Sequence, residues 1–191
     1  FERYNKLKRT FESVTEQLEI TKNEINHLES ISISLDIALS EDDLMQIRQE
    51  LADYNYIKKQ KSSKKQKLTS KPFHYVSSDG YDIYVGKNNY QNEELTFQFA
   101  NGGDWWFHAK NIPGSHVIVK ANGEELPDKV FEEAGKLAAY YSKARGNDKV
   151  EIDYTLKKNV KKPNGSAPGF VVYYTNYSLV IDSDISDIKQ V

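Results

Sequence analysis

The residue types best suited to chemistry in this chain lie together between positions 101 and 120. This segment contains both tryptophans, Trp105 and Trp106, and two of the four histidines, His108 and His116. Aromatic rings can stack on flat bases, and neighbouring lysines attract negative charge. A well-packed hairpin around the Pro-Gly turn of this segment would contain the same residues. The segment therefore predicts either a contact surface or an ordinary hairpin.

Alternation along the two expected strands divides this segment into two faces. Successive side chains of a strand point to opposite sides of the sheet. The economical arrangement buries Trp105 and Phe107, together with Val117 and Val119, in the core. The opposite face then contains Trp106, His108, His116 and Lys120, with Lys110 and Asn111 at its rim. That face could stack on bases and contact phosphates, or it could pack beneath a helix.

Metal binding and catalysis find little support in the same segment. His108 and His116 are eight residues apart and have no third ligand at a standard spacing. Asp104 could assist His108 in acid–base chemistry, but it follows Asn101-Gly-Gly, which is typical of a turn. The sequence contains no nucleophile elbow, P-loop or dinucleotide fingerprint. We therefore expect no catalytic residue, no metal and no cofactor.

Lysines gather in two further segments. Residues 58–71 contain seven lysines in fourteen positions, and no acid occurs between Asp53 and Asp79. The second segment contributes Lys157, Lys158, Lys161 and Lys162. Lysine without arginine suits attraction to a phosphate backbone better than the reading of bases. A solvated linker and a solvated loop are equally compatible with these two segments.

The first 57 residues predict an arm of two helices. Apolar residues recur at heptad spacing from Tyr4 to Leu39, and neither proline nor glycine occurs before Pro72. Ser40, followed by three acids, is a typical helix N-cap and opens a second helix. We expect an antiparallel coiled-coil hairpin, whose first helix is about 57 Å long. It could be a plain spacer or a binding arm.

A lysine-rich linker at 58–72 is expected to join this arm to a small mixed α+β domain at 73–191. Asn88 or Asn89 is predicted to cap a helix that reaches Ala100, and Lys87 with these amides could meet an anion. Asp128 is predicted to cap a second helix in this domain. The other expected elements are strands at 81–85, 105–108, 116–120 and 150–156 and a closing hairpin of 170–174 with 178–181.

The composition excludes several classes of protein. The 191 residues include no cysteine, so disulfide and thiolate chemistry are excluded. No stretch approaches the roughly 20 apolar residues that a membrane span needs. The chain begins with Phe1 in the middle of a heptad, and we expect it to be part of a longer protein.

Five motifs of the sequence resemble the NFACT family. Their order and spacing match that family over residues 73–181. Lys87 is a departure, because the family often has arginine there; the charge is kept but bidentate geometry is lost. The motifs are Ile83–Asn92, Asp104–Lys110, Pro113–Ile118, Ala138–Ser142 and Lys157–Gly169.

The resemblance implies that residues 73–191 form an RNA-binding NFACT-R domain and that residues 1–57 belong to the middle coiled coil. It further implies a cytoplasmic protein that binds the large ribosomal subunit with stalled peptidyl-tRNA and recruits tRNA for alanine tailing. Some Gram-positive members are named for fibronectin binding, which implies an alternative, a surface adhesin. No catalytic residue is transferred by the resemblance.

The candidate contact residues for RNA or another partner combine these arguments. They are Lys87, Asn88, Asn89, Asp104, Trp106, His108, Lys110, His116, Lys157, Lys158, Lys161 and Lys162.

Overall fold

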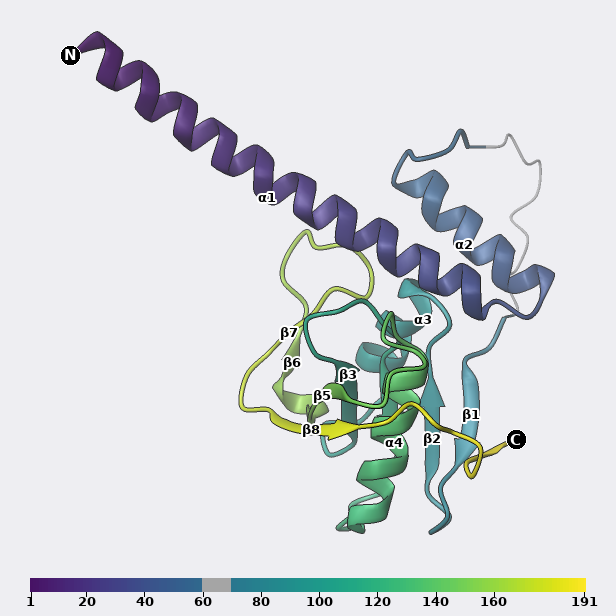
Figure 1. The fold of residues 1–191 in the computed structure, drawn as a ribbon. Helices are drawn as coiled ribbons and strands as arrows, with labels where there is room; N and C mark the ends of the chain where they lie inside the picture. Colours follow the sequence, from purple (N-terminus) through teal and green to yellow (C-terminus); the bar gives the residue numbers. More distant parts are fainter. Residues whose placement is uncertain (60–69) are drawn as a thin grey trace.

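The computed structural model describes residues 1–59 and 70–191 and confirms the mixed α+β fold. A long helical arm lies across one end of a domain built on an antiparallel sheet (Figure 1). Most of the lysine-rich linker expected at 58–72 lies outside the described residues. Within the described ranges, no helix is long and apolar enough to cross a membrane.

The arm consists of α1 (Glu2–Ile37) and α2 (Glu41–Asp53), and α2 folds back beside the end of α1 (Figure 1). The predicted cap is confirmed, because the Asp43 N–H donates to Ser40 Oγ at 3.2 Å and the Asp43 carboxylate accepts from the Ser40 N–H. This reciprocal capping box satisfies donors that a helix start leaves open. The helical hairpin is confirmed as well, and the N-terminal half of α1 projects away from the domain.

A seven-stranded sheet forms the centre of the domain, in the order β8-β5-β3-β4-β2-β1-β9. Its strands pair antiparallel throughout, and β3 lies between β4 and β5 and pairs with both. The strands are β1 (Phe73–Val76), β2 (Asp82–Val85), β3 (Trp105–Ala109), β4 (Val117–Val119), β5 (Val150–Leu156), β8 (Tyr177–Ile181) and β9 (Lys189–Gln190).

Helix α4 (Asp128–Tyr140) covers one face of this sheet. Val130, Ala134, Leu137 and Ala138 repeat at helical spacing and are fully buried against the strands. The prediction that Asp128 caps this helix is wrong. Pro127 takes the cap position without a side-chain hydrogen bond, and its fixed backbone angle suits the entry to the helix.

The opposite face is covered by shorter pieces of chain. They are α3 (Asn89–Glu94), the π-helical turn η1 (Leu95–Phe99), the 3₁₀ turn η2 (Lys157–Asn159) and a second sheet of β6 (Val160–Lys161) and β7 (Val172–Tyr173). The cap predicted at Asn88 is confirmed, because its side chain accepts from the Gln91 N–H at 3.0 Å. The helical segment reaches Phe99 and is capped at Ala100, as predicted, but its last five residues form the π-helical η1 rather than α-helix.

The predicted closing hairpin between residues 170–174 and 178–181 is wrong. Residues 172–173 pair with β6, whereas residues 177–181 pair with β5 in the central sheet. The split lets β7 bring Tyr173 against Trp106, while β8 satisfies the outer edge of β5. The two consecutive strands β7 and β8 therefore belong to two different sheets, and each covers a different part of the domain.

Candidate nucleic-acid interface

The face predicted to expose Trp106 and His116 is closed in the structure. Trp106 is 0% exposed and His116 is 2% exposed. The η1 turn and the β6–β7 sheet cover them, and the Tyr173 ring centroid lies 5.0 Å from that of Trp106. The expectation that these two side chains form an open stacking surface is therefore wrong. Trp105, expected in the core, is partly exposed instead.

The two histidines of this face are held in the neutral form by burial. His116 Nδ1 lies 2.8 Å from Thr96 Oγ1, and the His108 ring stands perpendicular to the His116 ring at 5.4 Å. Burial lowers the pKa of His108 to about 4. Burial is the main cause that lowers the pKa of His116 well below 6.5, and the neighbouring His108 is the second cause. Both rings remain polar and can exchange hydrogen bonds, but they carry no charge at neutral pH.

Asp104 has a structural role, as its position after Asn101-Gly-Gly suggests. Its carboxylate accepts from the Asn101 N–H at 2.7 Å and from the Ala121 N–H at 3.2 Å, and it forms an ion pair with Lys120. These bonds close the turn that leads into β3. Because the group is buried, it is not available to a partner in this conformation.

Lys87, Asn88 and Asn89, predicted to meet an anion, fasten the arm to the domain instead. Lys87 Nζ lies 3.2 Å from a carboxylate oxygen of Asp43 on α2. Asn88 Nδ2 donates to Gln46 Oε1 at 2.6 Å. Asn89 Nδ2 donates at 2.7 Å to both Ser30 Oγ on α1 and Glu50 Oε1 on α2. The sequence could not reveal this role, because the partners lie about 40 to 60 residues away.

Among the predicted lysines, Lys158 and Lys161 are the most available. Both are exposed, and neither takes part in an ion pair with another of the described residues. Lys162 is also exposed but pairs with Glu93 at 2.5 Å, while Lys157 lies over the Phe97 ring at 5.7 Å.

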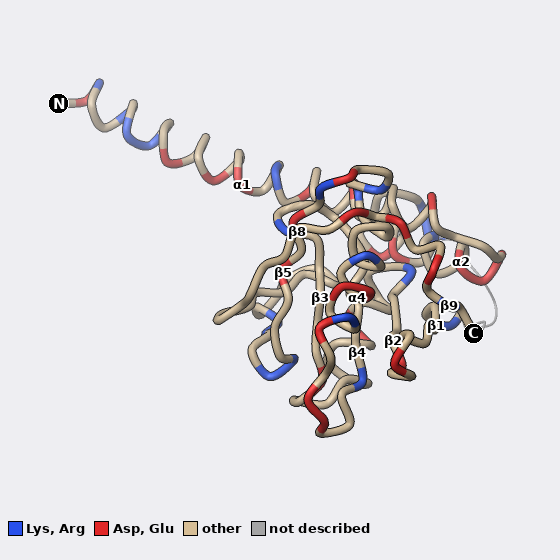
Figure 2. The backbone as a smooth tube through the Cα atoms, turned by 60° about the horizontal axis from the view of Figure 1, so that its bottom comes forward, with Lys and Arg blue, Asp and Glu red and all other residues tan. Residues whose placement is uncertain are grey.

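Lys110 pairs with Glu151 at 3.3 Å, so its charge is partly neutralised. Elsewhere basic and acidic residues are interspersed, as they are along α1 (Figure 2). The lysines that follow β5 are therefore the candidates best placed for phosphates, and their role stays a prediction.

A cavity of about 860 Å³ lies where the arm meets the domain. Its walls are the middle of α1, the turn at 111–114 and the connection from Gly165 to Tyr174. His108, His116 and Asn89 also line it. Sequence reasoning missed this cavity, because its walls come from three segments that are at least 50 residues apart. A partial signal was the spacing of Asn23 and Asn26, which places both amides on one side of α1.

Metal chemistry gains no geometric support in this region. Within residues 1–59 and 70–191, no group of three or more His, Cys, Asp or Glu side chains is arranged to hold a metal ion. What the site offers is a neutral cavity with exposed lysines nearby in the chain.

Comparison with protein families gives two matches that together span the chain. A family model described as the NFACT protein RNA binding domain matches residues 71–174. A second, described as the NFACT N-terminal and middle domains, matches residues 1–70.

Similar proteins and structures give the same assignment. A protein of Streptococcus suis named Rqc2 homolog RqcH is 43% identical over 99% of this chain and 34% of its own length. The Bacillus subtilis protein of that name is 39% identical over 98% of this chain and 33% of its own length. A Drosophila melanogaster protein, ribosome quality control complex subunit NEMF homolog, is 35% identical over 37% of this chain and 7% of its own length.

A solved structure, that of the C-terminal part of the fibronectin/fibrinogen-binding protein from Streptococcus suis, superimposes with a TM-score of 0.88. It is 41% identical and covers 98% of this chain and 74% of that one. The chain spans about a third of the length of the two bacterial relatives.

Proposed function

Because this chain belongs to the NFACT family, we propose that it is the RNA-binding part of a ribosome quality-control factor. The observation that carries the proposal is the match of the RNA-binding-domain family over residues 71–174. The names of the bacterial and fly relatives support the ribosomal context. In the finer form of the proposal, the whole factor binds the large subunit with stalled peptidyl-tRNA, recruits tRNA for alanine tailing and works in the cytoplasm.

In this proposal the chain binds and positions RNA and performs no reaction of its own. Lys158 and Lys161 meet phosphates beyond the end of β5, where both side chains are exposed. The arm extends away from the domain and supplies reach along a large partner. Lysine provides attraction without base specificity, so this contact contributes affinity rather than sequence preference.

The direct test is binding of the chain to a single-stranded RNA octamer and to large ribosomal subunits at several salt concentrations. Each phosphate engaged on the octamer should contribute a slope of about −0.7 to the plot of log K against log salt. The double variant Lys158→Glu/Lys161→Glu should weaken binding and reduce the slope by about 1.4. Binding that is absent, or independent of salt, would contradict the proposal.

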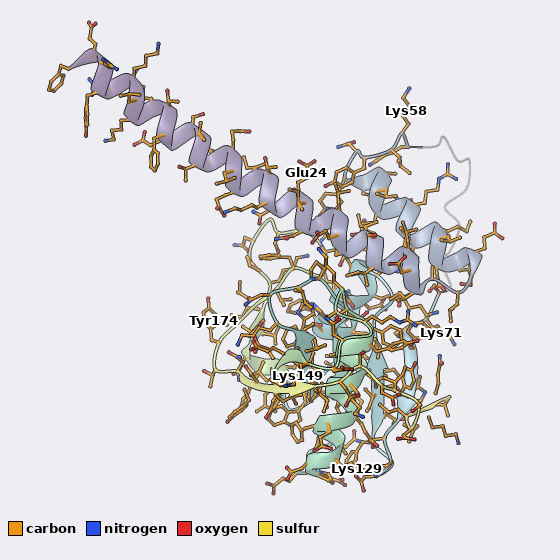
Figure 3. All side chains as sticks on the ribbon, in the orientation of Figure 1. Glu24, Lys58, Lys71, Lys129, Lys149 and Tyr174 are labelled. Atoms are coloured by element: carbon orange, nitrogen blue, oxygen red, sulfur yellow. The ribbon has the colours of Figure 1, made fainter. Side chains whose placement is uncertain are left out.

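A matched control is the double variant Lys129→Glu/Lys149→Glu, which changes net charge equally. Both of these lysines are exposed, and Figure 3 shows Lys129 at the far end of α4 from the arm. Lys149 precedes β5, whereas Lys158 follows it, so the strand separates the two sites. The control should keep the wild-type slope, apart from a small long-range effect that added salt screens.

A second candidate function is recognition of fibronectin. The observation in its favour is the likeness to the Streptococcus suis structure, whose protein is named for fibronectin and fibrinogen binding. Exposed aromatics such as Phe170 and Tyr174 are residue types that protein interfaces use. Surface plasmon resonance with fibronectin tests this candidate, and Lys158→Glu/Lys161→Glu controls for attraction by charge alone. Binding that disappears in that variant at moderate salt would count against a specific adhesin.

A further inference from the structure

The cavity between the arm and the domain has the walls of a ligand site rather than of a packing gap. Its volume of about 860 Å³ falls within the roughly 300–1,000 Å³ usual for sites that hold small molecules or parts of larger ones. The connection between β6 and β7 rises toward the underside of α1 and closes one side (Figure 1). The turn at 111–114 closes another.

The chemistry of the lining selects an uncharged ligand with polar edges. Among residues 1–59 and 70–191, no Asp, Glu, Lys or Arg lines the cavity. Hydrogen-bonding capacity comes from the amides of Asn23, Asn26 and Asn111.

The His108 and His116 rings also line the cavity, but both already form hydrogen bonds within the protein. The lowered pKa values of these two histidines keep both rings neutral at physiological pH. His27 also lines the cavity, but it lies 2.9 Å from the Glu50 carboxylate and is engaged there. A phosphate or a carboxylate would therefore find no unpaired counter-charge among the described lining residues, whereas an amide can pair with the edge of a base in two-point fashion.

Aromatic side chains at the same cavity provide flat surfaces. Phe170 is 50% exposed and Tyr174 is 63% exposed, although both are large rings that line the cavity. Figure 3 shows Tyr174 at the edge of the domain, below the arm. Tyr173 lies deeper and contacts Trp106, with ring centroids 5.0 Å apart. Exposed aromatic rings beside neutral amides are the combination with which proteins stack and read unpaired bases.

The third feature of this region is the position of the lysines relative to the cavity. Lys161 pairs in register with Val172, which lines the cavity. Lys158 lies farther away, because its N–H donates to the Gly102 carbonyl before the start of β3. A phosphate held at Lys161 would leave its attached base close to the cavity wall formed by Val172. Charge and base recognition are thus separated into adjacent places, as expected for single-stranded RNA, whose charge lies outside and whose bases can be splayed out.

We propose that this cavity receives one unstacked base of single-stranded RNA, held between the asparagine amides of α1 and the turn at 111–114 and the aromatic rings that flank β7, Phe170 and Tyr174. The inference rests on the proposed RNA-binding function and adds to it a base site that requires both the arm and the domain. It assigns Asn26 and Asn111 to the edge of the base and Tyr174 to its flat face.

The test compares an RNA octamer with an octamer of abasic ribose that has the same number of phosphates. If the cavity takes a base, the octamer with bases should bind roughly 5- to 100-fold more tightly, the range expected for a single stacked base. Asn26→Ala and Asn111→Gly should each remove several-fold of that advantage. The salt slope should remain unchanged, because no phosphate contact is altered.

Asn111 permits an unusually clean substitution. Its φ of 57° lies in the left-handed region, which glycine adopts without strain, so Asn111→Gly removes the amide and preserves the turn. Asn122 has a φ of 53°, is exposed and does not line the cavity, so Asn122→Gly is the matched control. Gln17→Ala is the control for Asn26→Ala, because Gln17 is an exposed neutral amide on the same helix that does not line the cavity. Both controls should bind like the wild type.

Two outcomes overturn the inference and leave the proposed function standing. One is equal binding of the two octamers with a normal salt slope, and the other is an advantage of bases that Asn26→Ala and Asn111→Gly leave intact. If neither octamer binds, the proposed function fails for this chain, and titration with adenosine, uridine, guanosine and cytidine decides on the cavity. Shifts in the His108 and His116 ring resonances would support a base site, and their absence would overturn it.

Discussion

The two faces of the central sheet are both buried, but they are closed in different ways. On the α4 face, Phe107, Val117 and Val119 belong to one apolar cluster with Leu137 of that regular helix. On the opposite face, a small apolar cluster around Trp106 lies beside the histidine pair and the cavity. That cover consists of a π-helical turn and a two-stranded ribbon rather than one long helix.

This difference indicates where stability and recognition reside in the domain. A continuous helix excludes water from one face and leaves little room for polar groups. Short pieces from distant parts of the chain leave polar side chains and a cavity between them on the other. The first face is therefore scaffold, and the second is where a ligand can be received. Stability and binding should respond separately to substitutions on the two faces.

Leu137→Ala should give the largest effect and tests the scaffold face. Leu137 is fully buried, so the truncation removes apolar contacts and leaves a void. We expect the free energy of unfolding to fall by about 3 kcal/mol in urea titrations, within the usual range for such changes. RNA affinity of the folded variant should stay unchanged. A fall in affinity without loss of stability would show that this face takes part in binding.

Acidification should have a smaller effect and acts on the histidine face. His108 has its pKa lowered from 6.5 to about 4, and the pKa of His116 is lowered as well. Below about pH 6.5 the unfolded chain therefore binds protons at these histidines that the folded chain does not bind. The free energy of unfolding consequently falls as the pH decreases toward 4. Between pH 6.5 and 5.5 the two rings together should lower the free energy of unfolding by about 2 kcal/mol.

The control for this pH dependence is His108→Gln, which should remove about half of the loss measured by urea unfolding at the two pH values. An unchanged pH dependence in this variant would mean that the imidazole of His108 is not held neutral by burial. The comparison would then lose its electrostatic basis, because the second face would not be closed against water.

The sequence analysis predicted what depends on local signals. Ser40 and Asp43, which span four residues, predict the start of a helix. Alternation along the strand correctly places Phe107 and Trp106 on opposite faces of the sheet. Alternation gives the side of a sheet but not what covers it. Trp106 is buried because η1 and β7 lie over it. Neither element can be assigned to that place from the residues around Trp106 alone.

The candidate site shows the same limit. Lys87 and Asn89 have the residue types of an anion site, but partners on α1 and α2 satisfy their side chains. The cavity is lined both by arm residues such as Asn26 and by Tyr174, and no local sequence pattern shows that these segments lie at the same cavity. Exposure of Lys158 and Lys161 was predictable, because a run of like charge in a loop usually remains in solvent.

Trp106 is closed off from solvent, so in the proposed binding mode RNA contacts the exposed lysines and the cavity instead. Acrylamide quenching of the variant Trp105→Phe tests this central claim most directly, because Trp106 is then the single tryptophan and is 0% exposed in the structure. The account predicts that its fluorescence is quenched several-fold more weakly than that of free N-acetyltryptophanamide. Quenching as efficient as that of the free compound would contradict the account and restore Trp106 as an open stacking surface.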